Sequence, residues 1–177
     1  MKRKMTWIAL VFAAIVLVCI GSVNAYMRKQ TQVVENVFVP ANVSCQVVET
    51  FTNNRDKTDV AIKNTSSINA YLRLRFVTYW IDSYGDIVYA EPATLNVDYD
   101  SANWIVKDNI YYYKDPVAPG EVTTDLLKTG AKITLTTSGN YRQVVEVFAE
   151  AIQSLPEKAV TESWGATVSG GKITAIK

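Results

Sequence analysis

The chain is 177 residues long, 49% hydrophobic and 20% charged, which fits one folded domain plus a targeting segment and argues against disorder over most of its length. Its formal net charge is +1, and without the three basic residues at positions 2–4 it carries 15 basic against 17 acidic residues, a charge of −2. A nearly neutral chain gives no electrostatic reason to expect nucleic-acid binding. The chain has no histidine, which excludes Ser-His and Cys-His catalytic dyads and histidine-based zinc sites.

The first 25 residues have the three parts of a secretory signal peptide. A basic start precedes an apolar run, and Val23 and Ala25 occupy the −3 and −1 positions of a cleavage site. We therefore expect residues 1–25 to be removed by a signal peptidase, between Ala25 and Tyr26. An uncleaved anchor is the alternative, because an apolar run of about 17 residues is at the lower limit for a membrane span. In both cases the rest of the chain leaves the cytoplasm, and with cleavage its contact with the membrane is only transient.

Residues 26–40 form an N-terminal arm between the expected cleavage site and the first strand. The arm begins basic and becomes apolar at Val37-Phe38-Val39, so it is either free or a strand that pairs elsewhere. Cleavage would leave Cys45 as the single cysteine of the mature chain, without a partner for an intramolecular disulfide. Its place in the alternating run 43–47 favours a small buried thiol over an intermolecular disulfide.

From residue 43 onward the sequence alternates between apolar and polar residues with the period of two that is typical of β-strands. In the clearest case, 70–81, Leu72 and Leu74 fall on one face and Arg73 and Arg75 on the other. Asp108-Asn109 predicts a hairpin turn, because both residues tolerate positive φ. The expected strands are 43–51, 57–63, 70–81, 87–89, 104–107, 110–114, 132–136, 143–151 and 172–176.

The segment 143–151 also fits a helix, since Glu146 and Glu150 have helical spacing, but its valines favour a strand. A short helix is expected over 156–163. Many short strands with regular turns and no long helix predict an all-β fold. We expect an antiparallel β-sandwich, jelly-roll or immunoglobulin-like, with one or two short helices, over residues 41–177.

The sequence offers little for catalysis or metal binding. Two acidic pairs, Asp82 with Asp86 and Asp98 with Asp100, are weak calcium candidates, because calcium takes oxygen ligands in loops. Neither pair matches the spacing of an EF-hand, and turn-forming aspartates explain the first pair without a metal. We therefore expect no catalytic residue, no cofactor and no enzymatic activity.

Aromatic residues are dense in the middle of the chain. Tyr79, Tyr84 and Tyr112 are candidates for contact with a polysaccharide or a host protein, and cross-strand packing is the alternative role of such rings. Arg73 and Arg75 share a strand face with Tyr79, where they either contribute to a ligand surface or stack on aromatic rings.

Several segments resemble the TasA/camelysin family of exported Gram-positive proteins, which a SipW-type signal peptidase processes. The similar segments are Glu35-Asn36-Val37-Phe38-Val39, Lys63-Asn64-Thr65 through Ala70-Tyr71-Leu72-Arg73, Tyr111-Tyr112-Tyr113-Lys114 through Pro119-Gly120-Glu121, Ala149-Glu150-Ala151-Ile152-Gln153 and Ser163-Trp164-Gly165. The resemblance implies a jelly-roll-like β-sandwich and a place in the extracellular biofilm matrix or a surface fibre. The metalloprotease activity attributed to camelysin is not carried over, because this chain has no HExxH motif and no histidine.

In fibres of this family the mature N-terminal segment of one subunit completes the sheet of the next. This implies that Tyr26 to Val39 is a donor strand, with the apolar residues Val33, Val34, Val37, Phe38 and Val39. The expected partner is a second copy or a related matrix subunit, in a head-to-tail contact that builds a filament. The leading hypothesis is a secreted, non-enzymatic fibre subunit. The alternative is a monomeric surface module that binds polysaccharide or host protein through exposed aromatic residues.

Overall fold

The computed structural model of the chain describes residues 42–53, 55–88 and 93–177. Residues Pro40–Lys177 form one compact unit by themselves. No helix within the described ranges is long and apolar enough to cross a membrane. Outside the described residues lie the expected signal peptide, its cleavage site and the arm, with Val23, Ala25, Tyr26, Val33, Val34, Val37, Phe38 and Val39.

The described residues are mostly β-strands in antiparallel sheets with one short helix, which confirms the expected all-β class. A three-stranded sheet has the order β1 (Cys45–Thr52), β2 (Asp56–Asn64), β7 (Ile133–Thr134). The β1–β2 turn is closed by the Arg55 N–H, which donates to the Thr52 carbonyl at 3.1 Å. Asn53 takes a positive φ of 53° in this turn, a conformation that asparagine tolerates better than most residues.

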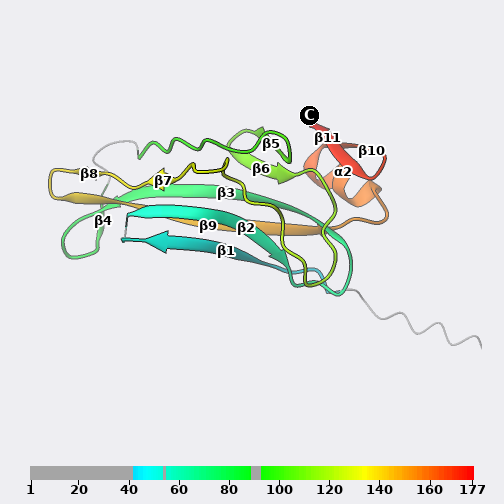
Figure 1. Cartoon of the computed structure of the whole chain (residues 1–177), viewed down its shortest axis with the longest axis horizontal. Helices are drawn as coiled ribbons and strands as arrows, with labels where there is room; N and C mark the ends of the chain where they lie inside the picture. The colour runs from blue at the N-terminus through cyan, green and yellow to red at the C-terminus, as the bar shows by residue number, and fades with distance from the viewer. Residues whose placement is uncertain (1–41, 54, 89–92) are drawn as a thin grey trace, which may run out of the picture. The chain divides into compact units, whose positions relative to one another are not determined.

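A six-stranded sheet is built around a long central pair, β3 (Ala70–Ile81) and β9 (Tyr141–Gln153) (Figure 1). The two strands pair without interruption from Ala70 opposite Gln153 to Ile81 opposite Arg142. The order is β5 (Trp104–Lys107), β6 (Ile110–Tyr113), β3, β9, β8 (Thr137–Ser138), and β4 (Ile87–Val88) also pairs with β3. The predicted turn between β5 and β6 is confirmed, since Asp108 and Asn109 both have positive φ.

Residues 158–176 form a helix and a two-stranded sheet, the C-terminal unit. The helix α2 (Lys158–Trp164) ends at Gly165, whose φ of 65° closes the last turn. The strands β10 (Ala166–Ser169) and β11 (Lys172–Ile176) then make a two-stranded sheet. The expected helix and last strand are therefore confirmed, and β8 and β10 are strands that the sequence pattern did not predict.

Buried apolar side chains gather in two clusters. The first takes residues from both larger sheets, among them Ile62 of β2, Leu72 of β3 and Val145 of β9. The second joins Tyr71 and Tyr112 of the six-stranded sheet to residues of the C-terminal unit. Leu72 and Tyr71 are consecutive on β3, so the alternation of this strand sends neighbouring side chains into different clusters.

Candidate functional site at the edge of strand β1

Strand β1 lies at one edge of the three-stranded sheet, and within the described ranges no strand pairs with its outer side (Figure 1). Its side chains are largely exposed, and Val48 and Phe51 are 41% and 45% accessible. An edge strand presents unpaired N–H and C=O groups and is a template for the addition of another strand.

The hydrogen bonds of β2 show which main-chain groups of β1 face the open side. The N–H of Asn64 donates to the Glu121 carbonyl at 2.9 Å, and the Val60 carbonyl accepts from the Leu126 N–H at 2.7 Å, so the even-numbered residues from Val60 to Asn64 face the segment 120–126. Cys45 lies opposite Asn64 in the β1–β2 register.

In an antiparallel pair, two residues that lie opposite one another either exchange main-chain hydrogen bonds or both direct their N–H and C=O groups away from the partner strand. The main-chain groups of Cys45 therefore point to the free edge. Val47 does the same, because it lies opposite Ile62, whose carbonyl accepts from Thr123 at 2.9 Å. These outward groups can accept and donate the hydrogen bonds of an added strand.

The side chain of Cys45 points toward the interior of the domain. It packs, half-buried, against the first cluster and forms no disulfide. Burial, and to a smaller degree the nearby Glu150 carboxylate, raises the pKa of its thiol. The thiol is accordingly less reactive than an exposed cysteine at neutral pH.

The second half of β1 carries an ion pair that the sequence pattern missed. The Lys57 Nζ lies 2.8 and 2.9 Å from the two carboxylate oxygens of Glu49 and 5.2 Å from the centre of the Phe51 ring. Lys57 is paired with Ile133, a residue of the first cluster, and is 6% exposed. Residues directly opposite one another share a face, so this lysine points inward.

A β-bulge explains why Lys57 faces inward. Between Val48 opposite Ala61 and Thr50 opposite Thr58, β1 advances by two residues and β2 by three. β2 therefore carries one extra residue here, and Asp59, within this bulge, has a φ of 51°. Lys57 would share its face with Ala61, not with the buried Val60, if the period of two were unbroken. The one sequence signal for the bulge is an aspartate, which tolerates this conformation.

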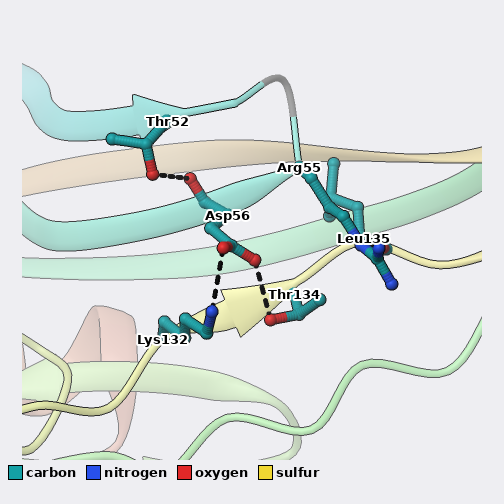
Figure 2. A network of polar contacts seen from close by, with 6 residues as sticks. All are labelled: Thr52, Arg55, Asp56, Lys132, Thr134 and Leu135. Carbon is teal, nitrogen blue, oxygen red and sulfur yellow. Dashed lines mark hydrogen bonds and ion pairs between the residues drawn. The ribbon is translucent and has the colours of Figure 1, made fainter.

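The other side of β2 is closed by the short strand β7 and a polar network (Figure 2). The Asp56 carboxylate accepts from Lys132 Nζ at 2.9 Å and from the Thr134 hydroxyl at 2.8 Å. The Arg55 Nε donates to the Leu135 carbonyl at 3.1 Å. The hydrogen bond from Lys132, followed by that from Thr134, lowers the pKa of Asp56. The open edge of this sheet is therefore that of β1.

The calcium candidates each have protein partners. Asp82 accepts the N–H groups of Tyr84 and Asp86 at 2.8 and 3.0 Å, which is the geometry of a turn. Asp98 pairs with Lys128 at 2.5 Å. Asp100 accepts from the Ala102 N–H at 2.9 Å and from the Asn103 amide at 2.7 Å. In the part of the chain that the structure describes, no three acidic or cysteine residues are grouped so that they could hold a metal ion.

The three candidate binding tyrosines lie in different environments. Tyr84 is 91% exposed in the turn after β3, and Tyr79 is half-buried with its hydroxyl donating to Glu146 at 2.7 Å. Tyr112 differs from the expected exposed ring, because it is 4% exposed and packs edge-on against Trp164. The reason is that α2 covers its end of the sheet, which the strand pattern alone does not reveal.

Arg73 and Arg75 stack on aromatic rings, which was the expected alternative to a ligand surface. The Arg73 guanidinium lies 4.5 Å from the Trp164 ring centre and 5.6 Å from that of Tyr112, and its Nη2 pairs with Glu150 at 2.5 Å. Arg75 lies 5.7 Å from the ring of Phe148. Arg73 thereby joins the helix to the sheet.

No protein-family model matches this chain, and neither a curated protein nor a solved structure does.

Proposed function

We propose that this chain is an exported, non-enzymatic structural protein of the extracellular matrix or cell surface, which assembles into fibres by strand donation. In this proposal a segment of the arm 26–39 of one copy adds to strand β1 of the next, and the two larger sheets form a β-sandwich of the jelly-roll kind. The observation that carries the proposal is the free edge of β1, where the main-chain groups of Cys45 and Val47 point away from the sheet.

The sequence before β1 and the physics of strand addition support the same proposal. The arm precedes β1 directly and contains five apolar residues, Val33, Val34, Val37, Phe38 and Val39. An added strand gains affinity from main-chain hydrogen bonds and specificity from alternate side chains. A contact in which the arm of one copy binds the domain of another is heterologous, so it propagates into an open filament unless its rotation closes a ring. The resemblance to fibre proteins points in the same direction.

A cavity near the six-stranded sheet gives no support to an enzymatic alternative. It has a volume of about 300 Å³ and is lined by apolar, threonine, asparagine and tyrosine side chains, among them Phe76, Thr78, Leu95, Asn109 and Tyr111. None of these lining residues is a carboxylate, a lysine or a cysteine, so the threonine and tyrosine hydroxyls of the lining have no such group beside them to activate them as nucleophiles.

The second candidate function is a monomeric surface module that binds a polysaccharide or a host protein. Val77 and Phe148 lie on the outer face of the six-stranded sheet and are 37% and 45% exposed, next to the stacked Arg75. Exposed apolar and aromatic groups beside arginine are typical of binding surfaces. This candidate requires a domain that is complete without its arm.

The experiment compares the protein starting at Tyr26 with one starting at Ala41, by size exclusion and negative-stain microscopy over a range of concentrations. We expect fibres or large oligomers from the first and monomers from the second. If both stay monomeric and equally stable, the second candidate moves to first place.

A substitution on the acceptor strand sharpens the comparison. Val47→Pro removes an N–H that has no partner in the described domain, and proline is tolerated where a strand N–H faces outward. We expect Val47→Pro to fold as the unaltered protein does and to stop assembly of the protein starting at Tyr26. Val47→Thr keeps the N–H and the β-branched shape and is expected to assemble. Fibres from the proline variant would contradict addition at β1.

A further inference from the structure

The edge of β1 is divided into two unlike halves. From Cys45 to Val48 the strand pairs residue for residue with β2. Beyond Val48 the bulge at Asp59 shifts the register, and bulges bend the strand pair and increase its twist. The extra residue lies on β2, so the outward groups of β1 keep their alternation, but the bend turns the second half of β1 away from a straight strand that follows the first.

The second half also carries charge on its inner side. The side chains of Lys57 and Glu49 are 8% and 30% exposed, so the pair keeps contact with water mainly through Glu49, the partner on the edge strand. A strand added outside residues 49–52 would cover this carboxylate and remove its remaining hydration. Desolvation of an ion pair opposes its burial, and bulges and inward-pointing charges are devices by which proteins protect sheet edges.

We propose that the Glu49–Lys57 pair and the bulge at Asp59 together act as a stop on the β1 edge. They confine strand addition to Cys45–Val48 and prevent two copies of the domain from pairing β1 to β1. This inference rests on the proposed function, since it concerns the same acceptor strand.

The stop selects the kind of partner that the edge accepts. The occupant is a short extended segment of a second copy, and the apolar block Val37-Phe38-Val39, which Pro40 ends, has the length that a four-residue edge accepts. A second β1 strand is rejected, because antiparallel pairing of two β1 strands over their whole length covers both Glu49–Lys57 pairs. The edge thus favours the head-to-tail contact over a closed dimer.

The first test uses residues 41–177, a unit with its own hydrophobic core. The double variant Glu49→Gln, Lys57→Met keeps the side-chain lengths and removes both charges. We expect it to form dimers at a concentration at least tenfold below that needed by the unaltered domain, as measured by sedimentation velocity. The matched control is Glu162→Gln, Lys158→Met, which neutralises an exposed pair on α2 and is expected to stay monomeric. Adding Val47→Pro to the first double variant should abolish its dimers.

The proposal is overturned if the folded double variant is as monomeric as the control, or if its dimers survive Val47→Pro. A second measurement needs no substitution in the stop. In assembled protein starting at Tyr26, hydrogen exchange should slow at the amide of Val47 and stay unchanged at that of Phe51, which lies beyond the bulge. Equal slowing at both amides would overturn the stop. Absence of any assembly would instead count against the proposed function, and the test on residues 41–177 would still decide the stop.

Discussion

Asn64 shows how one buried side chain can join three chain segments. It is fully buried at the end of β2. Its amide nitrogen donates to the carbonyls of Ile68 at 2.9 Å and Val117 at 2.7 Å, and its side-chain oxygen accepts the Ser66 N–H at 2.8 Å. Without the amide the Ser66 N–H and the Ile68 carbonyl would lose this partner, whereas the Val117 carbonyl would keep the Ala70 N–H, and an unsatisfied buried polar group costs about 1–3 kcal/mol.

We therefore predict that Asn64→Leu, which has a similar size, lowers the free energy of unfolding by about 3 kcal/mol or more. Urea denaturation of residues 41–177 followed by circular dichroism measures this change. Asn140 is exposed in the turn before β9, so Asn140→Leu is the matched control and should stay within about 0.5 kcal/mol of the unaltered domain. Equal effects of the two variants would show that the three hydrogen bonds are not specific to the buried site.

For single residues, the sequence predicts features that depend on neighbouring positions, such as the end of a strand. The expected strand 57–63 ends one residue before Asn64, the last residue of β2. The bond from Asn64 to Val117 joins residues 53 positions apart, and no local pattern indicates such a partner. Lys57 is a stronger case, since the unbroken period of two places it on the solvent face and the bulge at Asp59 turns it inward.

At the scale of elements, Asp56 joins the start of β2 to β7. β7 has two paired residues, and Asp56 lies opposite one of them, Thr134. The carboxylate accepts hydrogen bonds from both Thr134 and Lys132, so it links the two strands through side chains where the main-chain ladder is short (Figure 2).

We predict that Asp56→Asn destabilises the domain at pH 7 and has no effect in strong acid. The bonds from Lys132 and Thr134 lower the pKa of Asp56 in the folded state. A carboxyl with a lowered folded pKa stabilises the fold above its unfolded pKa of about 3.9, and this contribution is lost as the pH falls through the folded pKa. Urea denaturation of both proteins at several pH values between 7 and 2 measures the difference. A difference that stays constant over this range would contradict the role of the ionised carboxylate.

The strand predictions locate most strands and differ from the structure mainly in strand ends and in the shortest strands. The expected strand 70–81 has the bounds of β3, because twelve alternating residues carry a strong period. The helix alternative for 143–151 is wrong, and β9 extends two residues beyond the expected strand at each end. The expected strand 132–136 is reduced to Ile133–Thr134, since β2 offers only Asp56 and Lys57 as partners. The strands β8 and β10 are too short for their pattern to stand out.

At the scale of the whole domain, β3 separates two hydrophobic clusters. Leu72 and Leu74 belong to the first cluster and Tyr71 to the second. The second cluster depends on the C-terminal unit, whose Trp164 packs on the ring of Tyr112 and under the guanidinium of Arg73. This arrangement suggests that the C-terminal unit can open locally while the first cluster stays intact.

We predict that Trp164→Ala opens the C-terminal unit without unfolding the rest. Loss of a buried tryptophan side chain costs about 3–5 kcal/mol, and here the cost falls on contacts of α2, β10 and β11. Hydrogen exchange should therefore accelerate at the amides of these three elements and change little in β2. Leu126→Ala is the comparison, because Leu126 is fully buried in the first cluster and its loss should accelerate exchange throughout the domain. If Trp164→Ala accelerates exchange in β2 as much as in β11, the two clusters unfold as one unit, because the sheet between them would then transmit the loss from one face to the other.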